Sequence, residues 1–90
     1  MISAKINING KVQGVWFRDY VKRSAKELNL TGWVKNNSDG SVSVEVEGKK
    51  EIVKQLIDKI RVGSPLSRVD NVAVEWQKFD NKYNIFKIIR

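Results

Sequence analysis

The chain has 90 residues, of which 41% are hydrophobic and 30% charged, so we expect one globular domain over residues 1–90. The 17 Lys and Arg residues outnumber 10 acidic ones and give a formal charge of +7, which attracts anions without identifying them. With no His and no Cys, the sequence excludes Ser-His-Asp triads, phosphohistidine and Cys-thiolate enzymes, and Cys/His zinc sites.

Other features restrict the setting. No apolar run approaches the roughly 20 residues of a membrane helix, and the N-terminus alternates like a strand where a signal peptide would carry an apolar core. The acidic residues are scattered without a D-x-D pattern, so we expect no metal and no other cofactor. We expect a cytoplasmic monomer that binds no membrane.

The first half of the chain alternates between strand and helix patterns. A strand is predicted over residues 2–9 and, after a glycine-bounded loop, a helix over residues 17–28. Strands over residues 30–36 and 41–47 flank a turn at residues 37–40, where Asp-Gly supplies positive φ angles. In the third strand one face is expected in the core and the other in water: Val42, Val44 and Val46 inside, Ser43, Glu45 and Glu47 outside.

The second half contains a helix and two strands. The helix is predicted over residues 50–61 and stopped by Gly63-Ser64-Pro65. A fourth strand over residues 68–77 is expected to bury Val72, Val74 and Trp76, and a short last strand covers residues 84–90. The order β-α-β-β-α-β plus a short fifth strand predicts an α+β, ferredoxin-like split βαβ fold, with a largely antiparallel sheet and both helices on one face.

Residues 10–18, G-K-V-Q-G-V-W-F-R, combine features of an anion site. Glycines at the turn let backbone N–H groups swing toward a guest. The helix that follows directs its unpaired N–H groups and the positive end of its dipole to the same place. Arg18 in its first turn adds a planar fork of donors suited to phosphate. The segment therefore predicts a site for an anion, most plausibly a phosphoryl group.

Asn36 is the second candidate. In the split βαβ order only the third strand separates its strand from the first, so Asn36 can reach the rim of the glycine loop. Asparagine at a strand end is also a common turn residue, and the position alone leaves both interpretations open.

Two segments carry a family resemblance: I-N-G-K-V-Q-G-V-W-F-R at residues 8–18, and G-W-V-K-N-N-S-D-G-S-V at residues 32–42 closed by Gly48. They resemble the two signature segments of the acylphosphatase family. The resemblance implies hydrolysis of acyl phosphates to a carboxylate and inorganic phosphate. It also implies that the phosphate product inhibits the enzyme. It implies a phosphate cradle of backbone N–H groups from Val12, Gln13, Gly14, Val15 and Trp16, with Arg18 binding the phosphate and Asn36 holding the attacking water. A chain of this length resembles the free-standing, cytoplasmic members.

The chemistry agrees with this implication. An acyl phosphate leaves as a carboxylate whose conjugate acid has a pKa of about 4.3, so no general acid is needed. The phosphoryl-transfer transition state is loose, so positioning and charge stabilisation suffice without a strong general base. A phosphate oxygen of the substrate is one candidate for accepting the proton of the water.

Two alternatives belong to other classes. RNA-binding modules of RRM type share the topology but carry aromatic residues on the central strands, and the third strand here has none. We therefore expect no nucleic-acid partner. A regulatory domain that binds a small anion without catalysis would have the same loop; the presence of both Arg18 and Asn36 favours the enzyme.

Overall fold

The computed structural model describes residues 1–89 and contains the predicted elements in the predicted order. They are β1 (Ile2–Lys11), α1 (Phe17–Glu27), β2 (Thr31–Asn36), β3 (Val42–Gly48), α2 (Lys50–Val62), β4 (Arg68–Gln77) and β5 (Phe86–Ile89). β1 runs past its predicted end at residue 9, because a bulge between Asn9 and Gly10 lets its pairing with β4 continue to Lys11. The last strand was predicted to reach Arg90, which lies outside the described residues.

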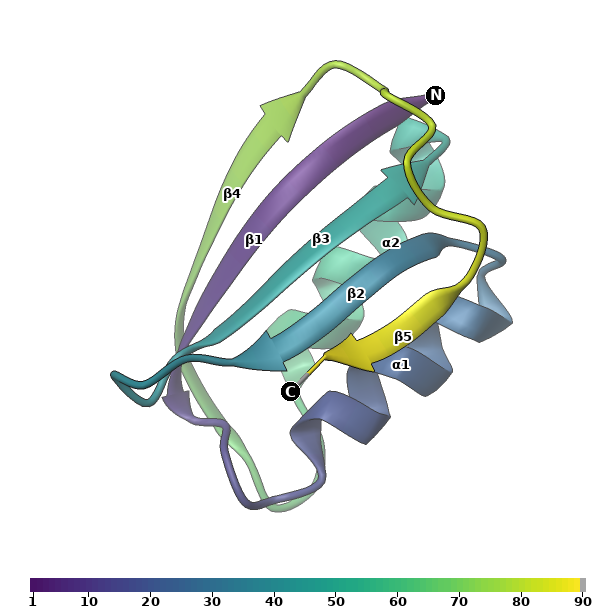
Figure 1. Cartoon of the computed structure of the whole chain (residues 1–90). Helices are drawn as coiled ribbons and strands as arrows, with labels where there is room; N and C mark the ends of the chain where they lie inside the picture. The colour runs from purple at the N-terminus through teal and green to yellow at the C-terminus, as the bar shows by residue number, and fades with distance from the viewer. Residues whose placement is uncertain (90) are drawn as a thin grey trace.

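The strands form one five-stranded sheet in the order β4-β1-β3-β2-β5 (Figure 1). β1 pairs antiparallel with β3 and β4, β2 pairs antiparallel with β3, and β5 joins β2 in parallel. The ferredoxin-like α+β prediction is confirmed. The parallel pair was not predicted. It arises because the chain leaves β4 at one edge of the sheet and crosses to the other edge before β5 begins (Figure 1).

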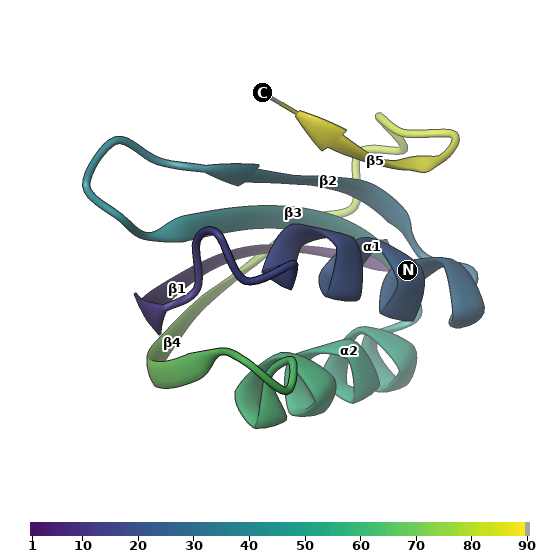
Figure 2. The same cartoon turned by 90° about the horizontal axis from the view of Figure 1, so that it is seen from below.

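Both helices cover the same face of the sheet, as predicted (Figure 2). The hydrophobic core fills the space between them, and full burial of a large apolar side chain contributes about 1.5–3 kcal/mol. The largest fully buried side chains are Phe17, Ile6, Ile8, Leu56, Ile60, Val12, Val21, Val34, Val42, Val44, Val46 and Val53. β4 lies at the sheet edge, so Val72 and Val74 are only half-buried. Trp76 is 37% exposed, and its predicted burial is wrong.

The other face of the sheet differs from the prediction in β3. Glu45 and Glu47, expected in water, are 6% and 2% exposed. The connection from β4 to β5 covers them. The Glu47 carboxylate accepts the backbone N–H groups of Asp80 and Lys82 at 3.1 and 3.0 Å, and Lys82 Nζ lies 3.6 Å from Glu45 Oε1. The alternating pattern gave the face of each residue correctly but could not show that a distant segment would cover it.

The strand order also sets the position of Asn36. Ile8 on β1 and Asn36 on β2 both pair with Val42 on β3, so the three residues form one row across the sheet. Strands are spaced by about 4.8 Å. The end of β2 therefore lies two strand spacings from the end of β1, where the glycine loop begins, and the predicted proximity of Asn36 to that loop is confirmed.

Candidate active site

The loop at residues 12–16 joins β1 to α1 and turns sharply at Gly14. Gly14 has φ 71°, a left-handed conformation that disfavours side chains, although a Cβ there would meet nothing within 4 Å. At Gly10 the restriction is steric as well, since a Cβ would collide with the carbonyl oxygen of Arg68 on β4. The two glycines thus serve different needs: Gly10 allows close strand approach, and Gly14 allows the turn.

Helix α1 starts directly after the loop. Trp16 is its N-cap residue, with φ 61° and ψ 20°, and no described side chain caps the helix start. The backbone N–H groups of Phe17, Arg18 and Asp19 have no partner within the helix, because the first helical hydrogen bond runs from Tyr20 N to Trp16 O at 3.0 Å. The helix therefore presents free donors and a partial positive charge beside the loop.

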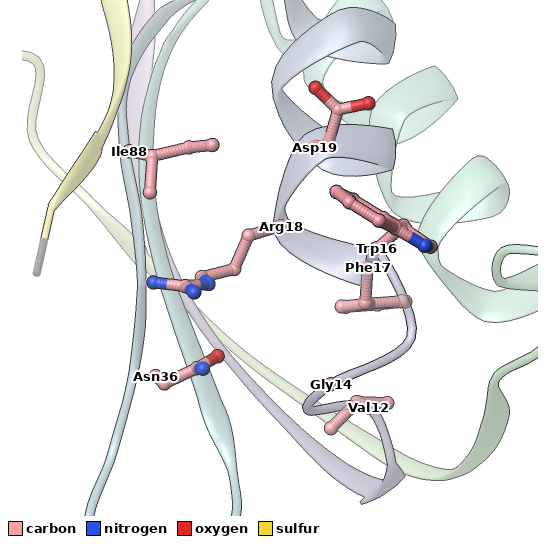
Figure 3. A pocket seen from close by; sticks show the side chains of 8 residues that line it. All are labelled: Val12, Gly14, Trp16, Phe17, Arg18, Asp19, Asn36 and Ile88. Atoms are coloured by element: carbon pink, nitrogen blue, oxygen red, sulfur yellow. The ribbon is translucent and has the colours of Figure 1, made fainter.

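A cavity of about 500 Å³ lies between this loop, the start of α1 and the ends of β2 and β5. Arg18 reaches from the helix toward the strands and points into the cavity that Asn36 lines from β2 (Figure 3). The cavity is lined by Val12, Gly14, Trp16, Phe17, Arg18, Asp19, Asn36 and Ile88. The structure thus brings together five of the predicted residues: Val12, Gly14, Trp16, Arg18 and Asn36.

Asn36 carries an unusual feature within the described part of the chain. Its Oδ1 atom is buried and accepts no hydrogen bond. Burying a polar atom without a partner costs about 1–3 kcal/mol, so such atoms are rare and call for an explanation. Arg18 is half-buried and makes no ion pair with a described residue. An acceptor without a hydrogen-bond partner and a cationic donor without an ion pair therefore line the same cavity.

The side chains of Gln13 and Val15 do not line the cavity but contact other parts of the protein. Gln13 Nε2 donates to the carbonyl oxygens of Asn37 and Ser41, both at 2.8 Å. This ties the loop to the β2–β3 hairpin and fixes the distance between the two halves of the site. Val15 is 9% exposed and belongs to the core. Gln13 and Val15 can therefore contact a ligand only through their backbone atoms.

Three lining residues were missed by sequence reasoning: Phe17, Asp19 and Ile88. Phe17 and Asp19 flank Arg18 in the first helical turn, a signal that the sequence did contain. Ile88 gave no such signal, because it reaches the cavity only through the parallel pairing of β5 with β2, in which it lies opposite Val34. The carboxylate of Asp19 is paired with Arg23 Nε, four residues later on the same helix, at 3.0 Å.

Known proteins are similar to this chain over most of its length. The family model "Acylphosphatase" matches residues 4–88. The acylphosphatase of Salinibacter ruber is 40% identical over 99% of this chain and 92% of that protein. The acylphosphatase of Rhizorhabdus wittichii is 49% identical over 82% of this chain and 75% of that protein.

The solved structures agree. The crystal structure of acylphosphatase from Bacillus subtilis matches with a TM-score of 0.97 and 33% identity, covering 100% of both chains. Sequence and fold thus agree with acylphosphatases along nearly the whole length. The chain belongs to the acylphosphatase family, the enzymes that hydrolyse acyl phosphates to a carboxylate and inorganic phosphate.

Proposed function

We propose that the cavity between α1 and β2 is where this chain hydrolyses acyl phosphates, with Arg18 and Asn36 as its catalytic residues. One observation carries the assignment: the buried, unpartnered Oδ1 of Asn36 lies in the same cavity as Arg18 and the uncapped helix start. The fold leaves all three without protein partners within the described residues, so a bound substrate and water would complete them.

The phosphoryl group is proposed to sit against the loop and the helix start. Backbone N–H groups of residues 12–16 and of the first helical turn supply donors, and the helix dipole supplies positive charge. The guanidinium fork of Arg18 would bind two phosphate oxygens at once. Because these donors are held in place before the substrate arrives, they stabilise the charge of the transition state without reorganising.

The attacking water is proposed to lie on Asn36. Oδ1 would accept a hydrogen bond from one O–H group of the water, which keeps that proton, and so orient an oxygen lone pair toward phosphorus. The carboxylate leaving group, with a conjugate acid of pKa about 4.3, departs without protonation. The remaining proton has an acceptor in a phosphate oxygen of the substrate, so the residues of the cavity need supply neither a general acid nor a strong base.

We propose that turnover needs no metal ion. Within residues 1–89 no group of three or more His, Cys, Asp or Glu side chains is placed to hold one. The test is phosphate release from acetyl phosphate and from methyl phosphate, each with and without EDTA. We expect turnover of acetyl phosphate that EDTA leaves unchanged, competitive inhibition by inorganic phosphate, and no turnover of methyl phosphate, whose alkoxide leaving group requires protonation. Equal rates on both substrates, or loss of activity with EDTA, would contradict the mechanism.

We further propose that the protein acts as a cytoplasmic monomer of one domain. Size-exclusion chromatography of the protein tests the monomeric state. None of the helices in residues 1–89 combines the length and apolar character needed to cross a membrane.

RNA binding of RRM type is not proposed. On the outer face, the central strands carry Lys5, Asn7, Ser43 and the covered Glu45 where such modules carry stacking aromatics.

A further inference from the structure

A second cavity lies next to the proposed active site. It measures about 330 Å³, and Trp16 and Asp19 line both cavities, so the two meet at the start of α1. Its far wall is formed by Pro65 and Leu66, in the connection between α2 and β4. Ser64 Oγ donates to the carbonyl oxygen of Val15 at 3.4 Å, which holds this connection against the glycine loop.

The backbone of Trp16 has a strained conformation. Its φ of 61° is uncommon for any residue with a side chain and is an outlier for a bulky one. Burial does not offset the strain, because Trp16 remains 78% exposed. Leu66, across the second cavity, is 66% exposed. Two large apolar side chains therefore face solvent on either side of one groove, directly beside the site that is proposed to bind phosphate.

The direction of the reaction connects the groove to the substrate. In phosphoryl transfer the attacking and leaving oxygens lie roughly in line on opposite sides of phosphorus. With the water on Asn36, on the strand wall of the cavity, the acyl group must point away from that wall. Figure 3 shows Trp16 on the opposite wall, at the junction of the loop and α1. The acyl group thus leaves the first cavity at Trp16, where the second cavity begins.

We propose that Trp16, Pro65 and Leu66 form an acyl subsite that makes the enzyme select substrates with an extended apolar acyl group. This inference rests on the proposed function and names the substrate class of that site. Apolar contact with Trp16 and Leu66 is gained only by acyl groups long enough to pass the ring, so hexanoyl phosphate gains it and acetyl phosphate does not. Each additional methylene that is fully buried strengthens binding about fourfold.

The test compares kcat/KM for hexanoyl phosphate with kcat/KM for acetyl phosphate. Straight-chain carboxylic acids have nearly equal acidities, so leaving-group chemistry is constant and the ratio reports binding of the chain. We expect the parent to prefer hexanoyl phosphate. In Trp16→Ala the ratio falls on the order of tenfold, and in Leu66→Ala roughly threefold. Trp16→Phe, which keeps an aromatic surface, restores most of the ratio.

Ile85→Ala is the matched control. Ile85 is 64% exposed, nearly as much as Leu66, and lines neither cavity. Its ratio should equal that of the parent. Ratios in Trp16→Ala and Leu66→Ala that equal the Ile85→Ala ratio would overturn the acyl subsite, even with acetyl phosphate hydrolysed normally. A parent protein that hydrolyses neither substrate would instead refute the proposed function.

Discussion

Two regions of this molecule bury polar groups, and they differ in the partners that the protein supplies to those groups. Under the β4–β5 connection, the Glu47 carboxylate accepts two backbone N–H groups and Glu45 is ion-paired with Lys82. In the cavity between α1 and β2, Asn36 Oδ1 is buried without a partner in the described chain, and Arg18 has no ion pair there. In the first region the protein supplies a nearby cation and two N–H donors, and the one atom left without a hydrogen bond, Glu45 Oε1, still faces Lys82. In the second region the described residues supply neither a hydrogen bond to Asn36 Oδ1 nor an ion pair to Arg18.

This difference separates stability from function. A paired buried group stabilises the fold, and removing it leaves its partners unsatisfied. An unpaired buried group costs stability in the free protein, so removing it leaves the fold intact or more stable. Variants in the two regions should therefore have opposite profiles: lost activity with an intact fold in the cavity, and lost stability with intact chemistry under the connection.

The largest effect is expected for Arg18→Lys. Lysine keeps the charge but loses the planar fork, and removal of one preorganised donor of this kind lowers kcat on the order of a hundredfold or more. The melting temperature should stay near that of the parent. Arg23→Lys is the matched control on the same helix, where the arginine pairs with Asp19. Half or more of the parent activity in Arg18→Lys would remove Arg18 from the catalytic site.

Asn36→Ala should lower kcat by about tenfold to a hundredfold through loss of water positioning, while the inhibition constant for inorganic phosphate stays unchanged. Its neighbour Asn37 is the control, because its side chain donates to the hydroxyls of Ser41 and Ser43 at 2.9 and 2.7 Å. Asn37→Ala should reduce the melting temperature and keep the rate. If Asn36→Ala instead lowers stability at an unchanged rate, Asn36 is a turn residue only.

Glu47→Ala tests the other region. Two backbone N–H groups lose the buried carboxylate that accepts from them, so we expect the free energy of unfolding to fall by about 1–3 kcal/mol in a urea titration. Turnover of acetyl phosphate, measured well below the melting temperature, should stay close to that of the parent. Glu75→Ala, at an exposed position of β4, should change neither quantity. Equal stability of Glu47→Ala and Glu75→Ala would show that the connection does not depend on Glu47.

The smallest effect is expected at Asp39, in the hairpin between β2 and β3. Hydrogen bonds from the hydroxyl and the backbone N–H of Ser41 lower the pKa of Asp39. A lowered folded-state pKa stabilises the protein at pH values above the ordinary carboxyl pKa of about 3.9, and this stabilisation is lost as the pH falls through the folded-state value. Asp39→Asn should therefore melt slightly below the parent at pH 6, with the gap closing in acid. A gap that grows as the pH falls would contradict this.

Much of the fold could be predicted because its signals are local. Helical spacing of Phe17, Val21 and Ala25 and the Asp-Gly turn each lie within a few residues of one another, and the element order follows from them. Arg18 and Asn36 could be paired as candidates because the split βαβ order has only one place for each of their elements.

The remaining features depend on contacts between distant segments. The crossing of the β4–β5 connection, which buries Glu45 and Glu47, leaves no periodic trace in the residues that it covers. The same holds for Ile88, which enters the cavity wall through parallel pairing. Trp76 has the pattern of a buried residue, but its strand lies at the sheet edge, and Lys50 Nζ above the ring at 5.3 Å is a long-range contact too.

The strand order also determines how the sheet meets other chains. β4 and β5 are the edges, where unpaired backbone groups invite another strand to add. β4 carries Arg68 and Asp70 on its exposed side, linked by a two-point ion pair at 3.0 and 3.2 Å. Asp70 also has no pairing partner on β1, and this bulge in β4 increases the local twist. β5 is only four residues long, with Lys87 exposed. Charge and twist at one edge and shortness at the other thus protect the molecule against edge-to-edge aggregation.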